Sequence, residues 1–528
     1  MNPQREERVT VDGGVRRASS LAVTREEWGA LAEMFAALAF EAVEPDAASP
    51  VFPDTSAARV AEIFRRPLPA EGLGLKALEA GCRDILGHTR RNNHPRMFGY
   101  VASPAAPVGA LASLFAAALN ANVTSWRSAP SPAEVERTTV RWLAEMIGYA
   151  DRHPGCGGLL TSGGSMANLV ALFVAHRAQA AREGDAGAAS RRGLWGATEP
   201  MTLYASDQVH LSIPKAADIL GLGREQVRAV PSDEDFRMDA RALAELIEAD
   251  KSRGLRPFCV VASAGTVATG AVDPLADVAR VARERGLWFH IDGAYGALAR
   301  AAESKRALFD GLDEADSVSL DPHKWLYAPV DCGCLILREP ERARAAFAGT
   351  EEGYIKVFER EQDEAFAFWD YGVELSRPFR ALKVWAMLGY YGARRISEAI
   401  AEDCALAAHL AALISEAEEF ELLAPVALGI CCFRYVPAEI KRELETAEGA
   451  ELESLNARLD ELNARVMQRV QRGGVAYLSN AVLRGRFALR ASITNFRTTR
   501  DDLAVTLDAV RRAAAECQRD SDSQGWIG

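Results

Sequence analysis

Residues 317–337 read SVSLDPHKWLYAPVDCGCLIL, and this stretch decides the fold. Two short apolar runs, Ser317–Leu320 and Cys334–Leu337, flank a turn that contains Pro322 and Lys324. Each run is too short for a helix, Cys334–Leu337 is apolar at every position, and Ser317–Leu320 adds only two small serines to Val318 and Leu320, which is typical of strands buried on both faces. The turn therefore follows the end of a strand, where open α/β sheets bind their ligands.

Further short apolar runs lie upstream, at Met201–Ser206, Phe258–Gly265 and Leu287–Asp292. Segments with helical periodicity alternate with them, namely Ala167–Arg182, Met238–Lys251 and Pro274–Arg285. This alternation indicates an α/β fold, with a mostly parallel sheet that carries helices on both faces. We expect this large domain to span residues 101–375.

The regions on either side of the α/β segment have other patterns. We expect residues 1–100 to form a helical arm, because four apolar residues fall on one helical face: Leu31, Met34, Phe35 and Leu38. We expect a small α+β domain over residues 376–528. One helical segment and three strand-like ones support it: Phe379–Tyr391, then Cys431–Tyr435, Val475–Ser479 and Phe487–Thr494.

Composition narrows the class of protein. The 528 residues are 49% hydrophobic and 25% charged, with a formal net charge of −12. That balance argues against a general nucleic-acid binder, which needs a basic surface. The nine cysteines include no C-x-x-C pair, so we expect no zinc ribbon or other metal site. Residues 1–20 are polar, and the longest apolar run, Ala105–Leu119, is too short to span a bilayer, so we expect a cytoplasmic protein.

Lys324 is the first candidate for chemistry. Most lysines are solvated surface residues, so a single lysine is weak support for a site. Lys324, however, lies between two apolar strands and is followed by Trp325 and Leu326. Partial desolvation there disfavours the ammonium form and leaves a nucleophilic amine. Such an amine can form an imine with an aldehyde.

Asp292 and His210 each follow another predicted strand. An aspartate in this position commonly caps a turn. Its functional alternative is an anionic partner for a pyridinium nitrogen, which makes the ring a stronger electron sink. His210 is either a structural histidine or a ring that stacks on an aromatic cofactor.

The segment LTSGGSMAN, residues 160–168, precedes a predicted helix. Its glycine pair leaves backbone N–H groups free at the start of the helix, where the dipole favours an anion. Gly164 and Ser165 could therefore bind a single phosphate, although a plain helix start is the alternative. The segment is neither G-x-G-x-x-G nor a Walker A loop.

Taken in chain order, Ser165, His210, Asp292 and Lys324 suggest the partners of a phosphorylated pyridine ring. The chain resembles the group II pyridoxal-phosphate (PLP) decarboxylases, which include the aromatic-amino-acid, glutamate, histidine and diaminobutyrate decarboxylases. The resemblance runs from about Thr24 to Arg511 and is most specific in SLDPHKWLYAPVDCGCLI, residues 319–336, and LSRPFRALKVWAMLGYYG, residues 375–392. It implies fold type I, with a seven-stranded central sheet.

The resemblance also implies a role for each matching residue. Lys324 would carry PLP as an imine, Asp292 would pair with the pyridine nitrogen, and His210 would stack on the ring. Further cofactor-binding positions that it implies are Gly164, Ser165, Thr266, Ala294, Asp321 and His323.

Tyr354 is the proton donor that the resemblance implies. It would lie on a mobile loop within the polar segment Gly349–Gln362 and protonate the substrate Cα after CO2 has left. Relatives that form aldehydes often carry Phe in place of this tyrosine or change the stacking histidine. Because Tyr354 and His210 are both present, simple decarboxylation is favoured. A surface aromatic residue is the alternative interpretation of Tyr354.

The predicted substrate residues come from two sources, the resemblance and the apolar residues near its motifs. The resemblance implies His94 and Arg490, and an aromatic slot could be lined by Phe98, Tyr100 and Trp126. This set favours an aromatic L-amino acid: tryptophan, tyrosine, phenylalanine or DOPA. Glutamate or 2,4-diaminobutyrate stays open, because Arg490 is compatible with an acidic substrate.

Three further alternatives belong to other classes of function: an aromatic aldehyde synthase, a PLP-dependent carbon–carbon lyase, and a non-catalytic scaffold with the same fold. The intact set of lysine, aspartate, histidine and tyrosine argues against the scaffold. The resemblance also implies a homodimer, with active sites at the interface and the N-terminal arm wrapping the second subunit.

Overall fold

The computed structural model describes residues 21–182, 193, 200–347 and 364–523. The described chain divides into two compact units. The first comprises the described residues of Met1–Glu44 and Thr55–Thr89, and the second comprises those of Pro45–Asp54 and Arg90–Gly528. The expected division at residues 100 and 375 stays a prediction.

The first unit consists of helices α1 (Arg25–Val43), α2 (Ala57–Phe64) and α3 (Leu75–Gly87). Thr24 begins α1 with a capping box, in which its hydroxyl accepts the N–H of Glu27 while the Glu27 carboxylate accepts the N–H of Thr24. The helical character expected for this segment is therefore seen. Met34 and Leu38 are buried, whereas Phe35 is exposed.

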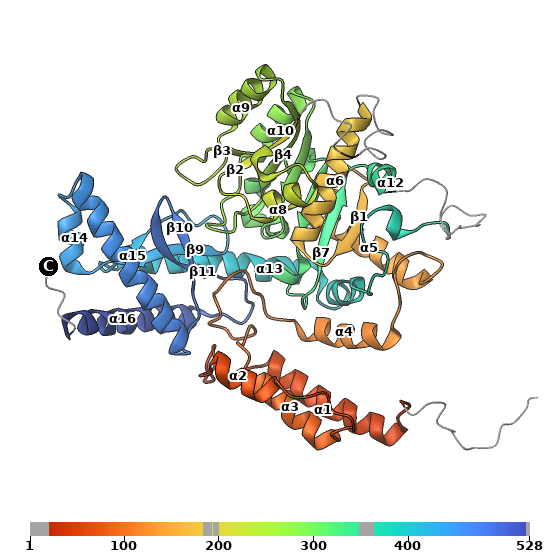
Figure 1. Ribbon diagram of the computed structural model, residues 1–528, viewed down its shortest axis with the longest axis horizontal. Coiled ribbons are helices and arrows are strands. Elements are labelled where there is room, and N and C mark those ends of the chain that lie inside the picture. Colours follow the sequence, from red (N-terminus) through yellow and green to blue (C-terminus); the bar gives the residue numbers. More distant parts are fainter. Residues whose placement is uncertain (1–20, 183–192, 194–199, 348–363, 524–528) are drawn as a thin grey trace, which may run out of the picture. The chain divides into compact units, whose positions relative to one another are not determined.

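A seven-stranded sheet organises the second unit, with the strand order β1-β7-β6-β5-β4-β2-β3 (Figure 1). The strands are β1 (Gly157–Thr161), β2 (Met201–Ser206), β3 (Val227–Val230), β4 (Arg256–Ser263), β5 (Trp288–Asp292), β6 (Ser317–Leu320) and β7 (Gly333–Leu337). Only β7 runs against the others, because both β1 and β6 pair with it in antiparallel register. The predicted mostly parallel sheet is confirmed.

Strands β2, β5, β6 and β7 are buried at every residue. Successive side chains of a strand point to opposite faces, so both faces of the sheet are covered. The helices of this part are α4 (Pro107–Leu119), α5 (Pro130–Met146), α6 (Gly164–Arg182), α8 (Ser212–Ile219), α9 (Ala240–Ser252), α10 (Leu275–Glu284), α11 (Pro322–Trp325) and α12 (Glu341–Phe347). Helices α6, α9 and α10 pack directly against the strands.

A second, antiparallel sheet has the order β10-β11-β9-β8. Its elements are β8 (Phe420–Leu422), β9 (Ile430–Tyr435), α14 (Ala438–Leu444), α15 (Gly449–Arg472), β10 (Ser479–Leu483), β11 (Arg486–Ser492) and α16 (Arg500–Ser523). The strand predicted at Val475–Ser479 is wrong, since β10 only begins at Ser479. The buried Tyr477 instead exchanges backbone hydrogen bonds with Arg96 and Phe98, so this apolar segment is buried without belonging to the second sheet.

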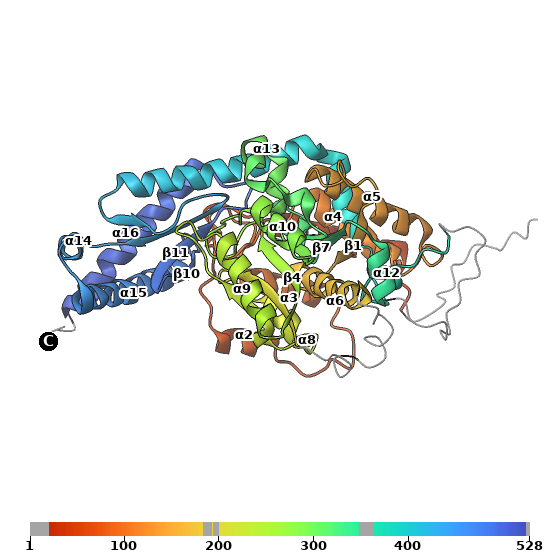
Figure 2. The same cartoon turned by 90° about the horizontal axis from the view of Figure 1, so that it is seen from above.

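Helix α13 (Ala381–Glu416) runs along both sheets of the second unit (Figure 2). Gly392, with φ of 75°, interrupts it, so two helical segments meet at this residue. The helix packs against α4 and α5 near its start and against β8 and β9 further along.

None of the helices in the described part of the chain has the length and apolar character needed to cross a membrane. The expected cytoplasmic location stays a prediction.

Candidate functional site

A cavity of about 670 Å3 opens at the carboxyl ends of β1, β2, β4, β5 and β6. This is the edge at which α/β sheets bind ligands. Nine residues predicted to bind a cofactor line it together: Gly164, Ser165, His210, Thr266, Asp292, Ala294, Asp321, His323 and Lys324. The structure therefore brings segments separated by up to 160 residues into one site.

Lys324 lies on the single turn α11, which Pro322 begins. Its Nζ is 3.0 Å from Oδ2 of Asp321, whose side chain is buried. The other oxygen of Asp321, Oδ1, has no hydrogen-bond partner among the described residues. A buried carboxylate oxygen without a partner is costly, so it indicates a ligand that supplies one.

Asp292 ends β5 at the base of the cavity and is only 7% exposed. Three donors reach its carboxylate: Nδ2 of Asn168 at 2.9 Å, the N–H of Ala294 at 3.2 Å and the hydroxyl of Ser319 at 3.3 Å. Hydrogen bonds to the ionised form offset the cost of burying its charge. The site thus holds a fixed negative charge at its base.

His210 has a defined tautomer. Its Nδ1 accepts the backbone N–H of Ser212 at 3.2 Å, so a neutral ring carries its proton on Nε2. Burial lowers the pKa of His210, which favours the neutral ring. A flat, uncharged imidazole therefore forms one wall of the cavity.

Two polar residues that the sequence analysis missed connect these groups. Asn168 donates to Asp292 and, at 2.9 Å, to the hydroxyl of Ser212, while its Oδ1 lies 3.1 Å from Nε2 of His290. An amide oxygen only accepts, so His290 donates through Nε2. Burial lowers the pKa of His290 to about 4, in agreement with a neutral ring.

Helical and strand spacing could have revealed both. Asn168 lies one helical turn after Gly164, and His290 lies two residues before Asp292 on the same face of β5.

The segment after β1 leads into the first turn of α6, a helix of 19 residues that begins at Gly164. A Cβ at Gly164 would lie 2.6 Å from the Cβ of Ala294 and 3.0 Å from Oδ2 of Asp321, so only glycine fits there. With Ser165 beside it on the cavity wall, the helix start presents backbone N–H groups to an anion.

His323 and Thr266 complete the set of predicted cofactor residues. The Nδ1 of His323 accepts the N–H of Cys332 at 3.2 Å, which leaves Nε2 as its donor, 3.5 Å from Oδ2 of Asp321. Burial lowers the pKa of His323 as well. The hydroxyl of Thr266 lies 3.0 Å from that of Thr269.

Arg490 and Tyr100 also line the cavity. The guanidinium of Arg490 donates to the carbonyls of Ala268 and Tyr100 and to the hydroxyl of Ser479, at 2.8–3.1 Å. Its Nη2 has no hydrogen-bond partner among the described residues, although Arg490 is only 3% exposed. A buried cation with a free donor is suited to a carboxylate.

The other predicted substrate residues lie elsewhere in the second unit. His94 is buried, and its Nδ1 accepts the N–H of Arg96 at 3.0 Å. Phe98 packs in the core around the second sheet, and Trp126 packs against the main core. None of these three residues lines the cavity that this chain forms by itself. Tyr354 lies outside the described residues.

The family model described as "Pyridoxal-dependent decarboxylase conserved domain" matches residues 60–436, more than half of the chain. The chain belongs to this decarboxylase family. The match covers the cavity residues from Gly164 to Lys324, and it makes this protein a PLP-dependent decarboxylase of amino acids.

Several known proteins resemble this decarboxylase over most of its length. An aromatic-L-amino-acid decarboxylase of Bacillus atrophaeus is 34% identical over 82% of this chain and 84% of its own. A phenylacetaldehyde synthase of Petunia hybrida is 28% identical over 86% of each chain. The crystal structure of Oryza sativa TDC with PLP and tryptamine covers 94% of this chain and 99% of its own, with a TM-score of 0.84 and 26% identity.

The cavity of the decarboxylase fits its cofactor. PLP carries an aldehyde, a basic ring nitrogen and a phosphate, and the cavity offers an amine, a fixed carboxylate and a helix start built around Gly164. The unpartnered Oδ1 of Asp321 adds an acceptor for a polar substituent of the ring.

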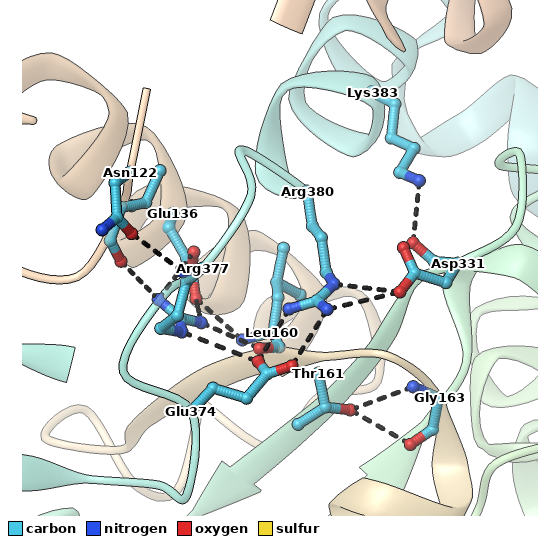
Figure 3. Close-up of polar contacts among 11 residues, drawn as sticks. Asn122, Glu136, Leu160, Thr161, Gly163, Asp331, Glu374, Arg377, Arg380 and Lys383 are labelled. Atoms are coloured by element: carbon cyan, nitrogen blue, oxygen red, sulfur yellow. Dashed lines mark hydrogen bonds and ion pairs between the residues drawn. The ribbon is translucent and has the colours of Figure 1, made fainter. Parts of the chain in front are cut away.

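A cluster of charged residues lies next to the loop after β1 of the decarboxylase (Figure 3). Arg377 pairs with Glu136, Arg380 pairs with Glu374 and Asp331, and Lys383 donates to backbone carbonyls of the segment after Lys324. All three cations lie within residues 375–392, a segment in which the sequence alone assigns no chemical role to them.

Proposed function

We propose that this decarboxylase converts an aromatic L-amino acid into the corresponding amine and CO2. The Bacillus relative is named for aromatic L-amino acids, and the rice structure holds tryptamine, an aromatic amine. The observation that carries the proposal is the convergence of Lys324, Asp292 and His210 on one cavity, whose wall also includes Tyr100.

Four groups of the cavity would hold the cofactor. Lys324 would bind its aldehyde carbon covalently, Asp292 would pair with the ring nitrogen, and Gly164 and Ser165 would bind the phosphate through their N–H groups. Bound in this way, PLP supplies an electron sink for the bond that breaks at the substrate Cα.

Asp292 and His210 would set the state of the ring. The carboxylate of Asp292, which three donors hold in place, would keep a proton on the ring nitrogen. The neutral imidazole of His210 would pack flat on the ring and keep water away from it. Ala294, beside Asp292, leaves room for the ring, and Asp321 with His323 and Thr266 would contact its substituents.

Arg490 would bind a carboxylate of the substrate through its free Nη2. With an aromatic amino acid, that is the α-carboxylate. Glutamate is a second candidate substrate on the same observation, because its side chain offers another carboxylate to this buried cation.

A panel of amino acids decides between these substrates. The purified enzyme, loaded with PLP, is incubated with each of the twenty amino acids and with DOPA, and CO2 and amine are measured. We expect CO2 and amine from tryptophan, tyrosine, phenylalanine or DOPA. Release of CO2 from glutamate alone would favour glutamate as the substrate. If no amino acid in the panel released CO2, both the aromatic and the acidic substrate would be rejected.

Aldehyde formation is a second candidate reaction, which the Petunia relative supports. It would consume O2 and water and release aldehyde, CO2, ammonia and hydrogen peroxide in place of the amine. We propose that Tyr354 donates the proton to the substrate Cα and so favours the amine. In Tyr354→Phe, aldehyde and peroxide should then rise relative to amine, whereas an unchanged product ratio would remove this role.

Attachment of the cofactor tests the site directly. Borohydride reduction of the loaded enzyme followed by peptide mass spectrometry should find PLP on the peptide that contains Lys324. Lys383 is an internal control, because it is a buried lysine that does not line the cavity, whereas Lys324 is partly exposed there. Lys324→Ala should lose the label, the visible absorbance of bound PLP and all turnover. A label on another lysine would contradict the assignment.

We also propose that two copies of the chain form a homodimer through the exposed face of α4. Leu111, Leu114, Phe115 and Leu119 recur on one side of this helix, and each is at least 48% exposed. A contiguous apolar stripe of this kind is typical of a protein interface.

A further inference from the structure

Among the described residues, β1 is an edge strand, because it pairs with β7 on one side and no described strand pairs with its other side. At Leu160 both backbone polar groups are directed to the open side, yet the residue is fully buried. Buried N–H and C=O groups need partners, and a sheet normally supplies them with a further strand.

Two side chains take the place of that strand. Oε1 of Glu136, on α5, accepts the N–H of Leu160 at 2.9 Å, and Nη2 of Arg377 donates to its carbonyl at 2.8 Å (Figure 3). The two also pair with each other, with Nη1 of Arg377 donating to Oε2 of Glu136 at 3.2 Å. Their side chains are 0% and 1% exposed, so solvent does not compete for these contacts.

The pair contacts Leu160, which lies directly before the loop from Thr161 to Ser165 that we propose binds the phosphate. Leu160 is followed by Thr161, whose hydroxyl donates to the carbonyl of Gly163 at 3.1 Å and accepts its N–H at 3.3 Å (Figure 3). Gly163 precedes the first residue of α6. The space at Gly164 is tight, so a small displacement of β1 would move the N–H groups that face the phosphate.

Arg377 is held firmly enough to set this position. Besides Leu160 and Glu136, it donates through Nη1 to the carbonyl of Val123 at 2.9 Å, and its guanidinium lies 4.2 Å from the ring centre of Phe368. A planar guanidinium fixed by several contacts is a geometrically defined donor, which a lysine ammonium could not reproduce.

We propose that Arg377 and Glu136 are positioning residues for the cofactor phosphate: they close the open edge of β1 and thereby hold the loop from Thr161 to Ser165 in its binding geometry. This inference rests on the proposed role of Gly164 and Ser165 in binding phosphate. It gives the segment 375–392 a function in the binding of PLP.

The test compares PLP with pyridoxal, which lacks the phosphate. Apoenzyme is titrated with each, and Kd is measured from the quenching of tryptophan fluorescence. The ratio of the two Kd values reports on the phosphate contribution alone. A general loss of stability would weaken both ligands alike and leave the ratio unchanged.

Arg377→Gln should raise the Kd for PLP by roughly ten- to a hundredfold, as expected when a buried carbonyl and a carboxylate lose their donor. The Kd for pyridoxal should stay within about threefold of the wild-type value. Glu136→Gln keeps an acceptor for Leu160 but loses the charge, so it should change the ratio in the same direction by a smaller factor.

Arg434→Gln is the matched control. Arg434 is a buried arginine on β9 that pairs with Glu421 and does not line the cavity. Its substitution removes an ion pair of another buried arginine, although Glu421 is 36% exposed, and should leave the ratio of the Kd values unchanged.

Each outcome has one meaning. A wild-type enzyme that binds PLP and pyridoxal equally would reject the phosphate role of Gly164 and Ser165. A wild-type preference for PLP that survives in both variants, or an equal loss for both ligands, would overturn the positioning role of Arg377 and Glu136. If Arg377→Gln fails to fold by circular dichroism, Glu136→Gln decides alone.

Discussion

The carboxylate of Asp292 lies at the base of the cavity, where three donors reach its negative charge. Asp292→Asn keeps the shape of the side chain but removes that charge. We expect kcat for decarboxylation to fall by about a hundredfold or more, as when one preorganised electrostatic partner of a reaction is removed. The change in KM should be much smaller, because the substrate does not contact this residue. Steady-state kinetics at saturating PLP measure both.

Ser319→Ala is the matched control for this prediction. It removes one donor to Asp292 and leaves the charge. Its kcat should stay within about tenfold of wild type, because the charge and the two other donors, Asn168 and Ala294, remain. A wild-type kcat in Asp292→Asn would show that the charge is not needed.

Among single residues, those at the ends of strands were easier to predict from the sequence than those that hydrogen-bond to them. Asp292, His210 and Lys324 follow apolar runs, and parallel strands bring such positions to one edge. Asn168 was missed as a partner of Asp292 because their contact depends on how α6 lies across β5. His94, which the resemblance implies for the substrate, does not line the cavity, and its Nδ1 accepts the N–H of Arg96, so its substrate role stays a prediction.

Helix α13 supports the element that carries Lys324. Asp403 on α13 accepts from Nε1 of Trp325, the last residue of the turn, at 3.0 Å and from the hydroxyl of Tyr327, two residues later, at 2.8 Å. Burial is the largest cause that raises the pKa of Asp403, to about 7. The folded chain therefore keeps this carboxyl protonated up to a higher pH than the unfolded chain does.

This difference predicts how stability depends on pH. As pH rises from about 4 to 7, the unfolded chain releases the proton of Asp403 first, so the free energy of unfolding falls across this window and levels off above it. Asp403→Asn removes the titration and keeps an acceptor. We expect the variant to gain at most about 4 kcal/mol over wild type at pH 8, and little at pH 4. Urea unfolding at both values measures the difference.

Asp508→Asn, an exposed carboxylate on α16, is the control and should change stability by less than about 0.5 kcal/mol at either pH. If Asp403→Asn shows the same difference from wild type at pH 4 and pH 8, Asp403 is ionised throughout and the prediction fails.

Among the elements, buried strands were predicted and edge strands were missed. Strands β2 and β6 have the predicted bounds, because each is a short run that is buried at every residue and is followed by an aspartate. Strands β1 and β3 lie at the two edges of the sheet and are partly exposed, and β1 begins with two glycines. Neither hydrophobic periodicity nor β-strand propensity identifies such a strand in the sequence. It is stabilised by pairing with strands that lie far along the chain.

At the scale of the whole molecule, the proposed dimer predicts that substitutions on the exposed face of α4 weaken the association of two chains. Phe115→Glu would bury a charge in the interface without a partner, so dimerisation should weaken by at least about tenfold. Analytical ultracentrifugation over a range of protein concentrations measures this. Leu308→Glu alters another partly exposed apolar residue and should leave association unchanged. A wild-type chain that sediments as a fully active monomer would contradict the dimer.

The contact between Leu160 and Arg377 spans 217 residues of sequence. A ribosome adds about 5–20 residues per second, so roughly 10–40 seconds separate the synthesis of β1 from that of the arginine that completes its edge. Throughout that interval the nascent chain carries an unfinished strand that could pair with a neighbouring chain. Loading of the cofactor should therefore be a late event in the life of a new molecule, and chaperones that cover exposed strand edges should raise its yield.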